Sequence, residues 1–106
     1  MPQPLRKTYP SLNLEAAQEQ VRQALKRATL ATGEDGRRLS SSVADFVGRL
    51  NLKLVERGHK PISRQAVLWW MSEGTFVDRI YWEPIEQISD LATTRRHLRP
   101  DIYRDG

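Results

Sequence analysis

The sequence contains no cysteine and only two histidines among its 106 residues. The absence of cysteine excludes disulfide bonds, thiolate zinc sites and thiol catalysis. The histidines, His59 and His97, lie far apart in predicted loops, and no HExxH-like spacing accompanies them. Because a zinc or iron site needs several such ligands brought together, we expect no metal and no cofactor.

The sequence also lacks a long hydrophobic run. No apolar stretch approaches the roughly 20 residues that span a membrane, and the N-terminal segment MPQPLRKTYPSLN has no apolar centre of the kind found in a secretory signal. We therefore expect a cytoplasmic protein with no membrane partner.

The common catalytic motifs are missing as well. There is no glycine-rich phosphate loop and no GxSxG elbow. Glu83 and Glu86 stand three residues apart, but this spacing is more typical of a solvated helix face than of a catalytic carboxylate pair. The sequence thus predicts that the protein is not an enzyme.

The charge that is present favours a nucleic-acid partner. The chain has 17 Lys and Arg against 13 Asp and Glu, a formal net charge of +4, and phosphates attract such an excess. The segment 57–72 contains basic residues and no acid, and a second basic cluster comprises Arg95, Arg96, His97 and Arg99. Each cluster, taken alone, is either a binding surface or a solvated one.

Hydrophobic periodicity predicts helices. Apolar residues recur at spacings of three and four, and each run has a capping residue before it: Asn13, Ser42 and Ser63. The predicted helices extend from 14 to about 31, from Ser42 to near Gly58, from Ser63 to Gly74, and onward from Pro84. Their expected inward positions are Leu14, Ala17, Val21, Ala24, Leu25 and Ala28; Val43, Phe46, Val47, Leu50, Leu54 and Val55; Ala66, Val67 and Trp70; and Ile85, Ile88 and Leu91.

These elements predict an all-α fold, a small bundle of four to five helices that contains a helix-turn-helix. We divide the chain into a flexible N-terminal arm (1–11), a helix-turn-helix DNA-binding domain (12–92) and an extended C-terminal tail (93–106), anchored by Leu98 and Ile102. The segment 76–82 leaves a short strand open as an alternative, because it is rich in β-branched and aromatic residues.

The stretch PISRQAVLWW, residues 61–70, carries the functional prediction. Adjacent helical positions point about 100° apart, so Trp69 and Trp70 cannot both be buried in one core. With Trp70 inward, Trp69 faces outward, together with Arg64, Gln65 and Leu68. Two helices joined by a turn, the second with Arg and Gln in its first turn, are typical of a helix-turn-helix DNA reader.

Each exposed side chain has a chemistry suited to DNA. Arg pairs with guanine and Gln with adenine through two hydrogen bonds in the major groove, and apolar groups contact the thymine methyl. We predict base contacts by Arg64, Gln65 and Leu68. Contacts to the DNA backbone position the protein on the duplex without specifying its sequence. We predict such contacts for Arg57, Lys60, Ser63, Trp69, Arg49 and Lys53.

Residues 62–104 resemble the Cro-like repressors of phages and prophages, in particular the YdaS-like group of antitoxins. The motifs that carry the resemblance are ISRQAVLWW (62–70), Gly74, the pair Ile85-Glu86, and TRRHLRPDIY (94–103). The sequence departs from the family pattern in residues 57–61, which widen the turn, at His97, where an acid is common, and over the N-terminal 40 residues, which do not match.

The resemblance implies a transcriptional regulator of a phage, prophage or toxin–antitoxin operon, located in the bacterial cytoplasm or nucleoid. Such a protein binds double-stranded DNA as a homodimer or higher homo-oligomer on a palindromic operator and acts as a repressor, and a toxin or host protein is a possible further partner. The alternative is a protein-interaction module that binds a host protein, RNA polymerase or a toxin, through exposed Leu68, Trp69 and Trp82. An RNA-binding function has less support, because no RNA-binding signature is present.

Overall fold

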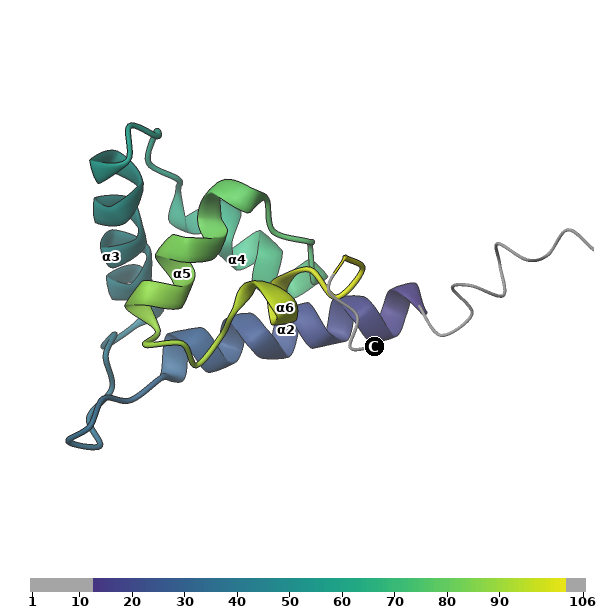
Figure 1. The fold of residues 1–106 in the computed structure, drawn as a ribbon, viewed down its shortest axis with the longest axis horizontal. Coiled ribbons are helices and arrows are strands. Elements are labelled where there is room, and N and C mark those ends of the chain that lie inside the picture. Colours follow the sequence, from purple (N-terminus) through teal and green to yellow (C-terminus); the bar gives the residue numbers. More distant parts are fainter. Residues whose placement is uncertain (1–12, 103–106) are drawn as a thin grey trace, which may run out of the picture.

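The computed structural model describes residues 13–102, which form a bundle of helices (Figure 1). Its elements are α2 (Leu14–Leu30), α3 (Val43–Glu56), α4 (Arg64–Glu73), the 3₁₀ helix η1 (Arg79–Tyr81), α5 (Trp82–Ile88) and α6 (Arg95–Leu98). No strand occurs among these residues, so the all-α prediction is confirmed. The alternative of a strand over 76–82 is wrong, because a loop and η1 occupy that segment. The predicted arm, residues 1–11, lies outside the described residues.

The helix α2 begins where its cap predicts. The Asn13 side chain accepts a hydrogen bond from the Ala16 backbone N–H at 3.1 Å, and Glu15 stands in the first turn, where the helix dipole favours an acid. The inward positions are buried from Ala17 onward. Leu14 is exposed, since it is the first residue of the helix and the buried positions of α2 begin nearly one turn later.

The helix α3 is capped by Ser42, whose hydroxyl accepts a hydrogen bond from the Asp45 backbone N–H at 3.0 Å. The Asp45 carboxylate accepts from the Ser41 N–H at 2.9 Å, so this capping interaction extends one residue further back than the capping box predicts. Val55 was expected inside and is exposed. It lies about 100° around the helix from Leu54, which is buried.

A single hydrophobic core joins the helices. Trp82 is buried in it, and its indole N–H donates to the Val77 carbonyl at 2.8 Å. The core residues are Val21, Ala24, Leu25, Ala28, Phe46, Val47, Leu50, Leu54, Val67, Trp70, Val77, Trp82, Ile85, Ile88 and Leu98. Since Leu98 belongs to this cluster, the chain beyond residue 93 packs into the same core as the helices before it.

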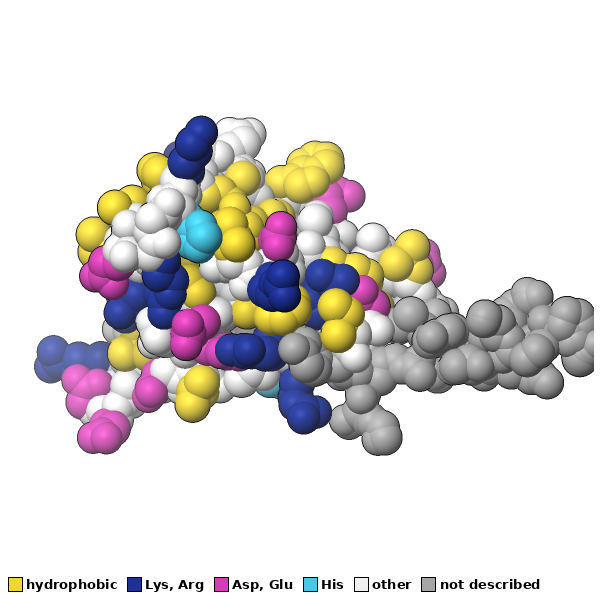
Figure 2. All heavy atoms as spheres, turned by 45° about the horizontal axis from the view of Figure 1, so that its top comes forward, with side chains coloured by type: hydrophobic (Ala, Val, Ile, Leu, Met, Phe, Trp, Pro, Cys, Tyr) yellow, Lys and Arg dark blue, Asp and Glu magenta, His cyan; other side chains and the backbone are white. Residues whose placement is uncertain are grey.

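Other large hydrophobic side chains stay at the surface, among basic and acidic ones (Figure 2). Leu91 is one of them, with 65% of its surface exposed, although the helical spacing predicted it inside. The reason is that α5 ends at Ile88, and Asp90 and Leu91 then adopt positive φ angles of 53° and 66° that turn the chain away.

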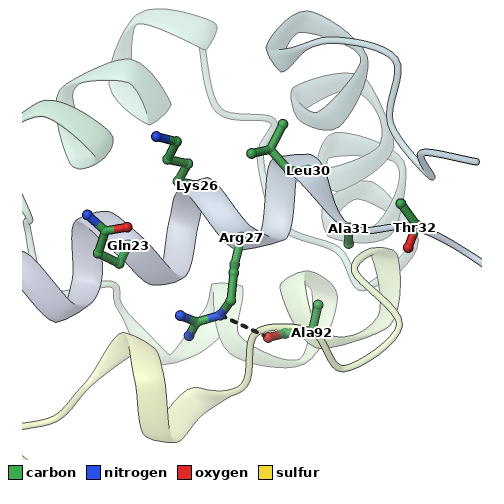
Figure 3. Close-up of a pocket in the computed structure, with 7 residues that line it drawn as sticks. All are labelled: Gln23, Lys26, Arg27, Leu30, Ala31, Thr32 and Ala92. Atoms are coloured by element: carbon green, nitrogen blue, oxygen red, sulfur yellow. Dashed lines mark hydrogen bonds between the residues drawn. The ribbon is translucent and has the colours of Figure 1, made fainter.

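The C-terminal segment was predicted to be extended, and this is wrong for residues 95–98, which form α6. The segment is fastened to α2 by two contacts. The buried Thr93 hydroxyl donates to the Ala24 carbonyl at 2.6 Å, and the Arg27 Nε donates to the Ala92 carbonyl at 3.4 Å (Figure 3). Leu98 is fully buried, as an anchor should be, but Ile102 is exposed and does not serve as one.

Candidate nucleic-acid interface

The helix α4 is held firmly at both ends. The Ser63 hydroxyl accepts from the Ala66 backbone N–H at 3.1 Å and so caps the first turn. Gly74 ends the helix in the left-handed conformation, and its N–H donates to the Trp70 carbonyl at 2.8 Å. Between these ends Val67 and Trp70 are buried, and α4 contacts both α2 and α3.

Asn51 of α3 fixes the entry into α4. Its side-chain amide donates to the Ile62 carbonyl at 2.9 Å and accepts from the Ile62 N–H at 2.7 Å. These two bonds clamp the residue that immediately precedes the Ser63 cap, and they set the start of α4 relative to α3. Asn51 was not among the residues predicted from the sequence. The available signal was a poor helix former in the middle of an otherwise regular helix.

The two adjacent tryptophans have opposite environments. Trp70 packs in the core with its ring against Tyr81, the centroids 4.8 Å apart and the planes at 64°. Trp69 points outward and is 62% exposed. Arg64, Gln65 and Leu68 are exposed as well, so the predicted outward face of α4 is confirmed.

Basic side chains accompany this face. Lys60 is exposed in the connection between α3 and α4, and Lys53 is half-buried near the end of α3. Within residues 13–102, neither of these lysines nor Arg64 forms an ion pair or a side-chain hydrogen bond. Their charges are therefore available to an anionic ligand.

Three other residues that were predicted to contact the DNA backbone, Arg49, Ser63 and Arg57, form hydrogen bonds within the protein. Arg49 donates to the Leu39 carbonyl at 2.6 Å and to the Ser40 hydroxyl at 3.0 Å, which ties α3 to the loop before it. Ser63 is used as the cap of α4, as predicted from the sequence.

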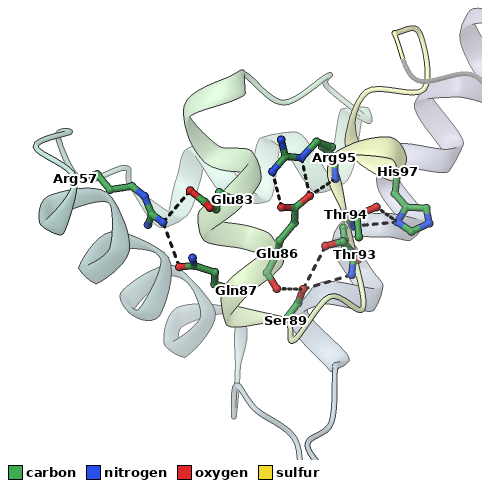
Figure 4. Close-up of polar contacts among 9 residues, drawn as sticks. All are labelled: Arg57, Glu83, Glu86, Gln87, Ser89, Thr93, Thr94, Arg95 and His97. Atoms are coloured by element: carbon green, nitrogen blue, oxygen red, sulfur yellow. Dashed lines mark hydrogen bonds and ion pairs between the residues drawn. The ribbon is translucent and has the colours of Figure 1, made fainter.

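Arg57 joins the end of α3 to α5. Its guanidinium lies 3.1 Å from the Glu83 carboxylate and 3.3 Å from the Gln87 side-chain oxygen (Figure 4). The side chains of Arg49 and Arg57 thus have partners within the chain, in contrast to those of Lys53, Lys60 and Arg64 within residues 13–102.

The predicted pairing of Glu83 and Glu86 on one solvated face is wrong for Glu86. Only 9% of Glu86 is exposed, and its carboxylate accepts three hydrogen bonds from Arg95: from the backbone N–H and Nε at 2.9 Å, and from Nη2 at 2.8 Å (Figure 4). These bonds to Arg95 hold the pKa of Glu86 below its usual range, so the carboxylate stays charged. Arg95 also lies over the Trp82 ring, 5.9 Å from its centroid.

A second arginine of the C-terminal cluster is paired in the same way. Arg99 donates to both carboxylate oxygens of Asp101, at 2.8 and 2.7 Å, and lies over the Phe76 ring at 5.7 Å. The hydrogen bonds from Arg99 lower the pKa of Asp101. Arg95, through Glu86, and Arg99, through the Phe76 ring, therefore join the C-terminal segment to the bundle. Of this basic cluster, only Arg96 and His97 are exposed.

The described residues offer neither a metal site nor a membrane span. They contain no group of three or more His, Cys, Asp or Glu side chains placed to hold a metal ion. None of their helices is both long and apolar enough to cross a bilayer. Comparison of the chain with protein-family models, with curated proteins and with solved structures finds no match.

Proposed function

We propose that this protein is a sequence-specific DNA-binding transcriptional regulator that reads DNA with the exposed face of α4. The observation that carries the proposal is the pairing of a rigidly held helix with free polar side chains at its start. Core packing, the Ser63 cap and the Asn51 clamp fix α4, while Arg64 and Gln65 project from its first turn. A helix of this kind fits the major groove with its N-terminal residues on the base edges.

The surroundings of α4 suit the DNA backbone. Lys60 and Lys53 supply unpaired positive charge, and the amide groups at the start of α4 favour a nearby phosphate. Trp69 and Leu68 offer apolar surface to sugars and thymine methyls. The resemblance of residues 62–104 to Cro-like repressors supports the same function, with a dimer on a palindromic operator that blocks transcription.

The test is a fluorescence-anisotropy titration with the DNA upstream of the protein's own gene, against a scrambled duplex of equal length, at two salt concentrations. We expect a preference of ~10³-fold or more for the upstream DNA and a steep loss of affinity with salt. Arg64→Ala should cost ~1–3 kcal/mol and relax the preference at one base pair, whereas Lys60→Ala should weaken both duplexes alike.

Arg37→Ala is the matched control. Arg37 is an exposed arginine in the loop before α3, whereas α4 follows the other end of α3, so this change should leave both affinities unaltered. Equal loss on both duplexes for Arg64→Ala and Lys60→Ala would show that the base-reading roles are misassigned.

Weak and equal binding of the wild type to both duplexes would replace the proposal by the protein-interaction alternative. The hydrophobic patch predicted for that alternative is smaller than expected. Trp82 is buried, so of its three predicted residues only Leu68 and Trp69 are exposed.

A further inference from the structure

A hollow of about 460 Å³ lies along α2, and none of the residues that line it belongs to α4 (Figure 3). Its floor is apolar, formed by Leu30, Ala31 and Ala92, and Figure 3 shows Lys26 and Arg27 extending to different sides of α2. The full lining is Gln23, Lys26, Arg27, Leu30, Ala31, Thr32 and Ala92. The hollow therefore combines an apolar floor with positively charged edges.

The charges at the hollow lack acidic partners within residues 13–102. The Lys26 side chain forms no hydrogen bond or ion pair there, and the Arg27 side chain donates only to the Ala92 carbonyl. An adjoining hollow of about 250 Å³ shares Gln23 and Arg27 and adds Arg96 and His97 from α6. One acid, Glu19, lines this second hollow.

Glu19 is already engaged by its own helix. Its carboxylate accepts from Gln23 at 2.7 Å and from Arg22 at 2.9 Å, and these bonds lower its pKa. It therefore does not neutralise Lys26 or Arg27, and the surface along α2 keeps an excess of positive charge.

We propose that this hollow binds an acidic segment of another protein, in which an apolar side chain lies between carboxylates. The apolar side chain would pack on Leu30, Ala31 and Ala92, and the carboxylates would pair with Lys26 and Arg27. Duplex DNA is the competing occupant, because its phosphates would match the two cations, and a DNA measurement on the same variants decides between the two. Single-stranded nucleic acid is disfavoured, since the first hollow has no aromatic ring on which a base could stack. The inference goes beyond the proposed function and does not depend on it.

The test starts from a selection of random 12-residue displayed peptides on the full-length protein, followed by anisotropy titrations of the enriched peptides. We expect enriched sequences with Asp or Glu on both sides of a large apolar residue. Lys26→Glu should weaken their binding about tenfold or more. Arg37→Glu makes the same charge change outside the hollow and should leave peptide affinity within about twofold, the change expected of a charge remote from the contact.

The inference as a whole fails if no acidic peptide is enriched, or if Lys26→Glu binds the enriched peptides as tightly as the wild type.

A DNA measurement on the same variants separates this inference from the proposed function. Lys26→Glu should lower affinity for the upstream duplex no more than Arg37→Glu does. A much larger loss for Lys26→Glu would assign the hollow to the DNA-binding surface and overturn the peptide proposal. If Arg64→Ala leaves DNA binding unchanged while peptides still bind at the hollow, the proposed function fails and this inference stands.

Discussion

At the scale of single residues, Gly74 meets two constraints at once. Its φ of 68° is left-handed, and a Cβ atom at this position would overlap the Gln18 carbonyl group of α2. The residue thus ends α4 and lets that end approach the α2 backbone directly. Gly48 is the opposite case, because it lies inside α3 and a Cβ there would meet nothing within 4 Å.

We expect Gly74→Ala to lower the free energy of unfolding by about 2–3 kcal/mol, since it adds backbone strain and a clash with main-chain atoms that cannot move aside easily. Gly48→Ala, the matched control, should raise it by about 0.5–1 kcal/mol through better helix propensity. Urea unfolding followed by circular dichroism measures both changes. A Gly74→Ala protein as stable as the wild type would show that α4 does not abut α2 in this way.

At the scale of elements, α6 shows how a very short helix is maintained. A helix of Arg95–Leu98 is far too short to be stable alone. It is held by the Glu86–Arg95 bonds, by buried Leu98 and by its own capping box. In that box the Thr94 backbone N–H donates to His97 Nδ1 at 3.0 Å. His97 is therefore the acceptor at the position where a capping box usually has Glu or Gln.

This capping role makes α6 sensitive to pH. Burial, and to a smaller extent the positive charge of Arg27, lower the pKa of His97 below its ordinary 6.5. Protonation would also place a hydrogen on Nδ1, which could then no longer accept from Thr94. As the pH falls from 6.5 toward the lower folded-state pKa, the unfolded chain binds more protons than the folded one, so the free energy of unfolding decreases.

We expect His97→Gln to remove this decrease between pH 7 and 5, because Gln can cap without titrating, and to change stability at pH 7 by no more than about 0.5 kcal/mol. Urea unfolding at a series of pH values measures it. Glu86 and Asp101 have lowered pKa values and lose their stabilising charge only at lower pH, so they do not obscure the effect. An identical pH dependence in both proteins would contradict the role given to His97.

At the scale of the whole molecule, the bundle separates two surfaces. The outward face of α4 carries Arg64 and Gln65, and the hollow on α2 carries Lys26 and Arg27. Because α4 and α6 both contact α2, that helix supports each surface. One recognition helix reads only a few base pairs, so the proposed function calls for two copies on one operator.

We expect two protomers per operator, with half-sites about one helical turn, ~34 Å, apart. Sedimentation of the protein with labelled duplexes measures the stoichiometry. Inserting about half a turn of DNA between the half-sites should abolish the two-protomer complex, and inserting about a full turn should restore much of it. A single protomer bound equally to all three duplexes would contradict the dimeric arrangement.

Much of α2, α3 and α4 is predictable because the signals are local. A cap such as Asn13, Ser42 or Ser63 acts on N–H groups two or three residues away, and the apolar spacing identifies the inward face of the same helix. The outward direction of Trp69 follows from the same rule. The burial predictions for Val55 and Leu91 are wrong, and both residues lie near the end of a helix. There, an error of one residue in the predicted end of the helix changes the direction in which a side chain points.

By itself, then, the sequence determined the helices α2, α3 and α4, their caps and the face that α4 turns outward, because these depend on interactions within a few residues. Only the tertiary structure decided which charges are free. Arg57 forms an ion pair with Glu83, Arg95 forms one with Glu86, and Asn51 forms hydrogen bonds with Ile62. The residues of each pair are too far apart in the sequence for the helical period to predict the contact. Buried polar groups need partners wherever the fold supplies them, and those partners become known only when the helices are packed.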